Sequence, residues 1–253
     1  MTKGIFYVAT GNKFIEEACA SARSVKEHMP DVHITGYFDK APEDSNFDNI
    51  VIIEEPAHSF GDKIPPFLDP PYDYNIFIDT DTICLEDFSD LFSVLDYYDM
   101  GIAHCVIKDC APDLNIAPDW FPEQNTGLVV FKKGATKKFF TEWNEKHEEF
   151  KKIKGPKFQN QPAFRYCLLR SDLNWMVIPR EYNLRPVHGW LASGHARVKI
   201  LHGRGYPMRK ALKNVNKVTR KYKGDHLKPR VGDLTMIERI WWNILRRLGL
   251  DDK

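Results

Sequence analysis

Two aspartates separated by one residue, Asp79 and Asp81, follow directly after the short apolar run Ile76-Phe77-Ile78. Such a run is typical of a buried strand, and charge at the end of a buried strand is unfavourable unless something positive compensates it. A divalent cation is the obvious compensating charge. In open α/β sheets, ligands bind beyond the carboxyl ends of the strands, which is where this pair is expected to lie.

The spacing of the two carboxylates limits how they can share an ion. Alternate residues of a strand lie about 6.6 Å apart, at a rise of about 3.3 Å per residue. Two oxygens on one magnesium ion lie at most about 4.2 Å apart, given bonds of about 2.1 Å. The strand must therefore end here, or one carboxylate must act through water, and the small Thr80 permits either. An Asp-x-Asp pair can also simply cap a loop or a helix, since so short a motif is weak evidence alone.

Length and charge limit the classes of protein to which the chain can belong. Its 253 residues suit one large α/β domain or two small ones, and 43% hydrophobic residues are enough for a core. With 36 basic and 35 acidic residues, the chain as a whole has no charge signature for nucleic acid. The charge is uneven, however. Acids predominate over residues 31–119, whereas residues 197–247 are basic and predict a face that could meet phosphates or anionic lipid.

The cysteines and the start of the chain predict a cytoplasmic protein. Cys105 and Cys110 have neither a Cys-x-x-Cys motif nor a nearby pair of histidines, so no zinc site is expected among the five cysteines. Free thiols in a reducing compartment are the simplest interpretation. No signal peptide follows Met1, and no apolar stretch approaches the ~18 residues that span a bilayer.

The alternation of strand-like and helix-like segments predicts an α/β protein. Residues 4–10 and 32–38 are strand-like, and residues 14–28 between them carry apolar side chains at helical spacing. This order indicates a βαβ unit and therefore parallel strands. The remaining expected strands are 50–53, 76–79, 100–106, 128–131, 175–178 and 198–201, and the remaining expected helices are 88–95, 135–151 and 161–169. Two proline-rich segments are expected to be loops: residues 56–74, which contain at most a short helix, and residues 109–123, which would lie over the site.

In this order the segments resemble those of the GT-A glycosyltransferases. The resemblance is strongest to the retaining, family 8-like group that includes glycogenin and the lipooligosaccharide galactosyltransferases. The motifs that carry it are Thr10-Gly11-Asn12, Asp79-Thr80-Asp81, Asn125-Thr126-Gly127, Asn160-Gln161 and His202-Gly203. Each motif alone is weakly specific, but their order is that of the family. The resemblance implies a mixed, mainly parallel GT-A sheet flanked by helices over residues 1–205, followed by a basic extension, 206–253.

The resemblance implies a metal-dependent hexosyltransferase. Such an enzyme moves a sugar from a nucleotide-diphosphate donor, with a UDP-sugar favoured, to a hydroxyl acceptor with retention. In this family two acids and a late histidine, here Asp79, Asp81 and His202, bind Mn²⁺ or Mg²⁺. The ion stabilises charge on the departing diphosphate, and a histidine ligand favours Mn²⁺. A glycan, a lipid-linked sugar, a protein or a small molecule could be the acceptor, nucleic acid is not expected, and the oligomeric state stays open.

The resemblance also assigns residues to the donor site. Asp79, Asp81 and Gln161 would be catalytic, and Asn125 would lie beside Gln161 around the sugar, since amides both donate and accept hydrogen bonds. The residues expected to bind the donor are Thr10, Gly11, Asn12, Lys63, Asp79, Thr80, Asn125, Thr126, Asn160, Gln161, Gly203 and Arg204.

Simpler interpretations stay open for several of these residues. Thr10 can belong to an ordinary strand-to-helix turn, and Asn125 to a turn before a strand. Lys63 can be a surface lysine, and His202 a histidine that merely ends a strand.

The chain departs from the family at two positions. The usual Asp-Gln pair is replaced by Asn160-Gln161, which leaves the donor sugar open. Met208 replaces the lysine that follows the late histidine by six residues, so Arg204, Arg209 or Lys210 would have to contact the diphosphate. No carboxylate nucleophile is evident, which favours front-face attack within an ion pair over a double displacement.

Two other functions compete with glycosyl transfer. A nucleotidyltransferase that makes the nucleotide sugar would need a glycine-rich, basic loop after the first strand, but residues 10–14 are short and poor in glycine. A non-catalytic nucleotide- or sugar-binding module is the second alternative. The complete set of acids, amides and histidine argues against it, although a fold alone never proves activity.

The C-terminal segment carries an amphipathic helical pattern. Apolar residues over 236–248 recur at helical spacing, include Trp241 and alternate with arginines. Such a helix, over residues 231–249, can lie in a membrane interface on the cytosolic side, which would suit a lipid-linked acceptor. It can equally dock on the domain or join two subunits, because amphipathicity alone does not separate these cases.

Overall fold

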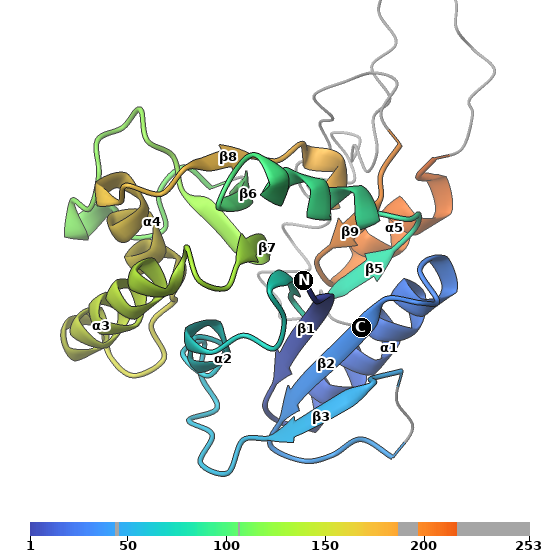
Figure 1. Ribbon diagram of the computed structural model, residues 1–253. Coiled ribbons are helices and arrows are strands. Elements are labelled where there is room, and N and C mark those ends of the chain that lie inside the picture. The colour runs from blue at the N-terminus through green and yellow to red at the C-terminus, as the bar shows by residue number, and fades with distance from the viewer. Residues whose placement is uncertain (44–45, 106, 187–196, 217–253) are drawn as a thin grey trace, which may run out of the picture.

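A seven-stranded sheet forms the centre of the molecule in the computed structural model, which describes residues 1–43, 46–105, 107–186 and 197–216 (Figure 1). The strands are β1 (Lys3–Ala9), β2 (His33–Phe38), β3 (Asn49–Ile52), β4 (Tyr74–Ile78), β5 (Thr82–Cys84), β6 (Met100–His104), β7 (Gln124–Lys132), β8 (Trp175–Val177) and β9 (Ile200–His202). The α-helices are α1 (Asn12–His28), α2 (Pro65–Leu68), α3 (Lys137–Lys154), α4 (Gln161–Arg170) and α5 (Gly205–Asn214), and the 3-10 helices are η1 (Ser89–Asp96), η2 (Pro112–Leu114) and η3 (Arg180–Tyr182).

The sheet is mixed and mainly parallel, as the sequence predicts. Its strand order is β3-β2-β1-β4-β7-β6-β8. Strands β1, β2, β3 and β4 pair in parallel, as do β6 and β8, whereas β7 runs antiparallel to both of its neighbours. The amino end of β7 therefore lies beside the carboxyl ends of β1, β4 and β6. The rim formed by these strand ends is called the sheet edge below. This edge brings together segments that are far apart in the sequence.

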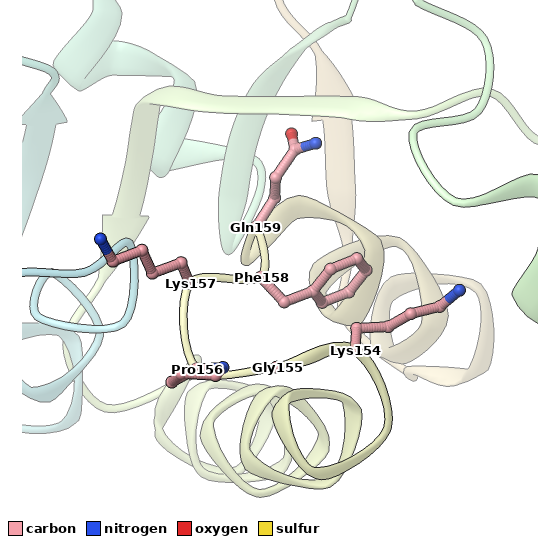
Figure 2. A pocket seen from close by; sticks show the side chains of 6 residues that line it. All are labelled: Lys154, Gly155, Pro156, Lys157, Phe158 and Gln159. Atoms are coloured by element: carbon pink, nitrogen blue, oxygen red, sulfur yellow. The ribbon is translucent and has the colours of Figure 1, made fainter.

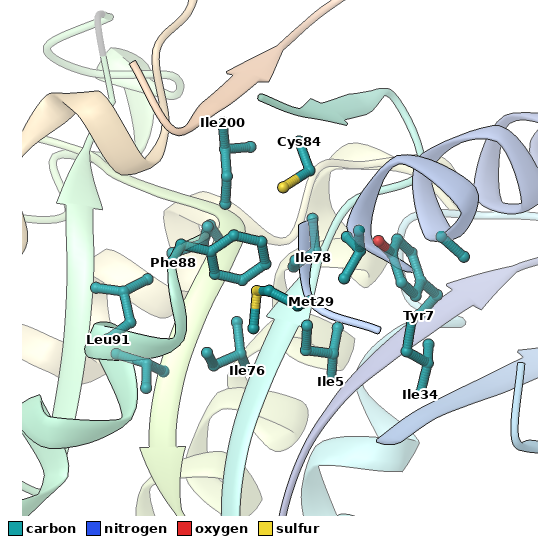
Figure 3. Packing of buried hydrophobic residues seen from close by; sticks show 14 of the residues in the cluster. Ile5, Tyr7, Met29, Ile34, Ile76, Ile78, Cys84, Phe88, Leu91 and Ile200 are labelled. Atoms are coloured by element: carbon teal, nitrogen blue, oxygen red, sulfur yellow. The ribbon is translucent and has the colours of Figure 1, made fainter. Parts of the chain in front are cut away.

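Alternating side chains of the central strands supply two separate cores. Ile5, Tyr7, Ile76 and Ile78 face one side, where they pack with α1, η1 and β5 (Figure 3). The intervening residues of the same strands face the other side, where they pack with aromatic residues of α2, α3 and α4, such as Trp143. A strand buried on both faces reads as a continuous apolar run, which is the pattern that β4 and β7 show.

A second, two-stranded sheet was not expected from the sequence. β5 follows β4 after a break at residues 79–81 and pairs antiparallel with β9, with Thr82 opposite His202. β5 escapes sequence-based detection because it has only three residues and lies directly after the two aspartates. Its pairing with β9 is nevertheless what brings His202 to the end of β4.

Several predicted boundaries were wrong. The segment predicted as a helix at 88–95 is a 3-10 helix, and β6 ends at His104 rather than at residue 106. β7 begins at Gln124, so Asn125 lies inside a strand and not in a turn before it. The last strand begins at Ile200 rather than at residue 198. These shifts follow from pairing with neighbouring strands, which local sequence does not encode.

The C-terminal extension is only partly described. Helix α5 packs Met208 and Ala211 against Leu184, Val198 and Leu201. The amphipathic helix predicted over 231–249 lies outside the described residues, and its contact with a membrane or with the domain stays a prediction. Among the helices that the structure describes, none combines the length and the apolar character needed to cross a bilayer.

A shallow hollow of about 480 Å³ lies between the end of α3 and the start of α4 (Figure 2). Its lining includes Lys154, Lys157, Phe158 and Gln159. No residue predicted to bind a donor or metal contributes to it. The candidate site lies instead at the sheet edge described next.

Candidate functional site

Asp79, Asp81 and His202 come together at the carboxyl end of β4. β4 ends at Ile78, and the backbone N–H of Asp79 donates to the carbonyl of Gly127 in β7 (2.8 Å). The strand therefore ends at the pair, which is one of the two arrangements that the spacing of the acids allows. Nε2 of His202 lies 3.3 Å from Oδ1 of Asp81 and 3.8 Å from Oδ2 of Asp79. One potential ligand atom from each residue lies within 4.8 Å of the others.

A chain of amides fixes which nitrogen of His202 faces the acids. The backbone N–H of Gly127 can only donate, so Oδ1 of Asn125 must be its acceptor (3.1 Å). That same oxygen accepts from Nδ2 of Asn183 (2.9 Å), which leaves Oδ1 of Asn183 to face Nδ1 of His202 (2.8 Å). Nδ1 must then carry a hydrogen, and Nε2 is the nitrogen that faces the two carboxylates.

This arrangement fits a divalent cation. A carboxylate has no hydrogen to donate, so a neutral Nε2 facing two carboxylates is stable only if a proton or a cation lies between them. A ligating histidine commonly donates its other N–H to a carbonyl oxygen, as His202 does to Asn183. Oxygen ligands together with one imidazole suit Mn²⁺ better than Mg²⁺. The three predicted ligands therefore have the chemistry of a metal site, while the identity of the metal rests on the donor set alone.

Lys63 is not a lone surface lysine. Its ammonium group lies 3.1 Å from Oδ1 of Asp79 and 3.2 Å from the carbonyl of Thr126, and its side chain is only 13% exposed. It also lies over the ring of Phe77. A partly buried, held cation beside a metal ligand is well placed to meet an anionic group of a substrate.

Arg204 compensates the second aspartate. Its guanidinium donates to both carboxylate oxygens of Glu17 (2.8 and 2.6 Å) and lies 3.0 Å from Oδ2 of Asp81. Burial raises the pKa of the Asp81 carboxyl, but the charges of Arg204 and of His202 with a proton on Nε2 outweigh burial and hold that pKa below its usual range. Glu17 also accepts from the hydroxyl of Thr80 (3.1 Å), so it links the loop between the aspartates to α1.

The structure explains why a methionine is acceptable at position 208. Met208 lies in α5 and is 6% exposed, packed in the small apolar cluster under β9. Arg204 precedes the helix and reaches Asp81 from the segment directly after β9. A cation therefore lies beside the site although position 208 supplies none. Gly203, whose φ of 141° favours glycine, donates its N–H to the carbonyl of Asp81 (2.8 Å) and starts this turn.

Gln161 and Asn125 lie next to each other at this edge. Oε1 of Gln161 accepts from Nδ2 of Asn125 (3.2 Å) and from the backbone N–H of Thr126 (3.3 Å). Asn160 is more enclosed, at 2% exposure. Its side chain bonds the hydroxyl of Thr126 and the carbonyl of Phe60. The polar atoms of the Asn160 side chain are therefore already bonded within the protein, and its contact with the nucleotide-sugar donor stays a prediction.

The loop between β1 and α1 has acidic partners that the sequence did not suggest. The hydroxyl of Thr10 donates to Asp62 (2.7 Å), and the N–H of Gly11 donates to both oxygens of Asp39 (3.0 Å each). Gly11 has a φ of 98°, a conformation that favours glycine. Asn12 is the first residue of α1 and is exposed. Asp39 and Asp62 therefore lie beside Thr10 and Gly11, two of the residues predicted to bind the donor.

The predicted loop over the site is held from beneath by buried charge. Arg165 is 1% exposed, and its Nη1 lies 2.7 Å from Oδ2 of Asp109 and 3.9 Å from Oε2 of Glu123. Glu123 is fully buried and accepts from the backbone N–H of Cys110 (3.2 Å). Burial raises the pKa of Glu123 to about 7.

Replacement of Glu123 by glutamine is expected to change how stability depends on pH. Between its ordinary pKa of 4.5 and about 7, Glu123 keeps its proton in the folded chain but loses it in the unfolded chain. The unfolded state then binds fewer protons, so the free energy of unfolding falls as pH rises through this window. The parent should lose about 3 kcal/mol more than the variant over this range. Urea denaturation at pH 4.5 and 7.5 measures the difference, with exposed Glu55→Gln as control, and parallel losses in parent and variant contradict the assignment.

The site contains residues that the sequence analysis did not select. Asn183, Glu17, Asp39 and Asp62 are ordinary polar residues of turns and helix faces in the sequence, and no motif marks them. Gly127 belongs to a recognised motif, yet its reason is visible only in three dimensions. A Cβ at position 127 would lie 2.3 Å from Cε1 of His202, 2.7 Å from Asp79 Oδ2 and 2.9 Å from Asn125 Oδ1.

The sheet order, the antiparallel β7 and the paired acids after β4 define a GT-A fold, which confirms the predicted fold class. Two solved structures share this architecture. One is the galactosyltransferase LgtC in complex with donor and acceptor sugar analogues, with a TM-score of 0.58 and 15% sequence identity. The other is a glutamine-to-glutamate active-site mutant of LgtC, with a TM-score of 0.57 and 14% identity. Each match covers 86% of this chain and 98% of the LgtC chain.

The likeness to LgtC establishes the fold but not the reaction, because the sequences are too different. No protein-family model matches the chain, and no curated protein sequence matches it either. The function must therefore be argued from the side chains at the sheet edge.

Proposed function

We propose that this chain is a metal-dependent glycosyltransferase that moves a hexosyl group from a nucleotide-diphosphate sugar, with UDP favoured as the nucleotide, to a hydroxyl acceptor. The observation that carries the proposal is the set of Asp79, Asp81 and His202, in which the amide chain turns Nε2 toward both carboxylates. LgtC, whose fold this chain shares, is a galactosyltransferase with donor and acceptor sugar analogues bound. Mn²⁺ is the favoured cofactor, with Mg²⁺ as the alternative.

The residues around the proposed metal have complementary roles. A cation held by the three ligands would stabilise the negative charge that develops on the departing diphosphate. Lys63 and Arg204 lie beside the proposed ligands, and both can donate charge-assisted hydrogen bonds to the phosphates. Asn125 and Gln161 would bond sugar hydroxyls, since both lie at the same edge and both carry a donor and an acceptor.

Transfer with retention is the proposed stereochemical course. The residue held beside Asn125 is Gln161, an amide and not a carboxylate nucleophile. Front-face attack is therefore favoured over a covalent glycosyl-enzyme. The acceptor hydroxyl would pass its proton to the departing phosphate oxygen, so that no side-chain base is required.

The connection between β1 and α1 disfavours a nucleotidyltransferase. β1 ends at Ala9 and α1 begins at Asn12, so only Thr10 and Gly11 lie between them. A glycine-rich loop that wraps a triphosphate needs more backbone than these two residues provide. Activity measurements distinguish an enzyme from a non-catalytic binding module of the same fold.

Calorimetry with UDP, GDP and ADP, each with and without Mn²⁺, tests the proposal. At least one nucleotide should bind in a metal-dependent way. Asp81→Ala should weaken this binding by at least about 100-fold, because even the loss of an outer partner of a metal ligand costs 10- to 100-fold. Asp96→Ala removes an exposed carboxylate from the end of η1 and should leave binding unchanged. If no nucleotide binds with the help of the metal, the proposal is wrong, and metal-dependent binding without donor hydrolysis or transfer would indicate the non-catalytic module.

A further inference from the structure

Two thiols lie against the amide of Gln161. Nε2 of Gln161 is 3.9 Å from Sγ of Cys105 and 3.7 Å from Sγ of Cys110, so one amide group contacts both thiols. The orientation of this amide is fixed, since Oε1 accepts from the backbone N–H of Thr126. The NH₂ group must therefore point at the sulfurs. All five cysteines of the chain are free thiols, so this pair is reduced.

One buried residue sets the separation of the two cysteines. The carbonyl of Glu123 accepts from the N–H of Cys105 (2.8 Å), and its carboxyl accepts from the N–H of Cys110 (3.2 Å). Arg165 adds an ion pair to Asp109, directly before Cys110. Glu123 and Arg165 are 0% and 1% exposed, and burial of charged groups is costly unless they are paired and hydrogen-bonded. Here the arrangement that they hold is a pair of adjacent thiols beside Gln161.

The pair has the protonation pattern of a reactive dithiol. The hydrogen bond from Cys110 lowers the pKa of Cys105 to about 5 and, in return, raises the pKa of Cys110. Cys105 is therefore the thiol of the pair that ionises more readily. Burial instead raises the pKa of Cys84 and of Cys167 to about 12, so those two thiols stay protonated and inert. Cys105 is 7% exposed, whereas Cys110 is partly exposed and offers a route from solvent.

We propose that Cys105 and Cys110 form a reversible disulfide on exposure to hydrogen peroxide, and that this modification weakens the hydrogen bonds from Gln161 to the two sulfurs. The thiolate attacks one peroxide oxygen, so that an S–O bond forms, the O–O bond breaks and the leaving hydroxide becomes water after taking up a proton. The second thiol then displaces the oxygen of the sulfenic acid as a second water and forms the S–S bond. Two thiols are oxidised and one peroxide is reduced.

The disulfide removes the charge that Gln161 faces. A thiolate is a charged acceptor for the amide N–H, whereas a disulfide sulfur is a neutral and weak one. Loss of one hydrogen bond to a charged group corresponds to about a tenfold change in a rate or binding constant. The expected effect on glycosyl transfer rests on the proposed function, but formation of the disulfide does not.

Peptide mapping tests for the disulfide directly. Lys108 lies between the two cysteines, so trypsin releases Cys105 in residues 64–108 and Cys110 in residues 109–132. Cys84 shares the first peptide and is replaced by serine in the test protein, where the hydroxyl can keep the bond to the Glu86 carbonyl. After hydrogen peroxide and thiol blocking, the two peptides should be joined and should separate on reduction with dithiothreitol. If they stay separate, the proposal is overturned.

Matched variants and a rate measurement complete the test. Cys110→Ser should abolish the joined peptide, and Cys167→Ser should leave it. Peroxide should lower the donor hydrolysis or transfer rate of the test protein about tenfold, with recovery on reduction. The rate of a Cys105→Ser variant, which lacks the thiolate that attacks the peroxide, should be the same before and after peroxide. Joined peptides with an unchanged rate overturn the effect on Gln161. Joined peptides in a protein that binds no nucleotide support the disulfide and contradict the proposed function instead.

Discussion

Replacement of Gly127 by alanine is expected to abolish metal-dependent nucleotide binding. The added methyl group would lie 2.3 Å from Cε1 of His202 and 2.7 Å from Oδ2 of Asp79, distances that real Cβ atoms essentially never show. It would also lie 2.9 Å from Oδ1 of Asn125, the oxygen from which the orientation of His202 follows. One methyl group would thus displace two of the proposed metal ligands together with the amide proposed to bond the sugar. We expect a loss of metal-dependent affinity of at least about 100-fold.

Gly134 provides a matched control for this substitution. It lies in the turn after β7, is exposed, and a Cβ at this position would meet nothing within 4 Å. Gly134→Ala should therefore bind Mn²⁺ and nucleotide as the parent does. Titration calorimetry with Mn²⁺ and UDP compares the three proteins, and circular dichroism checks that each is folded. A folded Gly127→Ala protein with parental affinity for metal and nucleotide would contradict the geometry of the site.

The second large effect is expected at Asn183, a residue that touches the proposed metal only through His202. Asn183→Ala removes the acceptor for Nδ1–H of His202 and the donor to Asn125. The imidazole then loses its fixed orientation, and the affinity for Mn²⁺ should fall about 10- to 100-fold. Asn183→Asp keeps an acceptor for His202 but places an oxygen against Oδ1 of Asn125. This variant should retain most of the metal affinity and lose donor binding.

The two Asn183 variants together separate a positioning role from a purely structural one. Metal affinity measured by calorimetry should rank the parent first, then Asn183→Asp, then Asn183→Ala, whereas donor affinity should be reduced in both variants. Gln159→Ala removes an exposed amide from the surface and serves as the control. Equal loss of metal affinity in both variants would mean that Asn183 matters for the local fold and not for the orientation of His202.

The sequence predicts those parts of the molecule that depend on local patterns. Apolar runs and helical spacing located the strands from β1 to β4, the long helices and the break after Ile78. The family order then joined His202 to the two aspartates, and the structure confirms that they lie together. These predictions were confirmed because each depends on a pattern in consecutive residues, or on a motif with a known place in the family order.

The parts that the sequence does not predict depend on pairing between distant segments. Nothing in the four-residue apolar run Leu128-Val129-Val130-Phe131 shows that β7 is antiparallel, yet this direction places Asn125 at the site. Asn183 follows a 3-10 helix and has no local sign of its role as a partner of His202. The thiols of Cys105 and Cys110 meet because Glu123, from a later segment, bonds both backbones.

The pairing of Thr82 with His202 also has a consequence for the order of folding. The third proposed metal ligand joins the other two only when β9 pairs with β5, and a very long stretch of sequence separates these two strands. Closing so long a loop carries an entropic cost that the short β5–β9 ladder must offset. A cation that binds only the closed arrangement shifts this equilibrium by mass action. The ion would then stabilise the pairing of β9 with β5 in addition to serving as a cofactor.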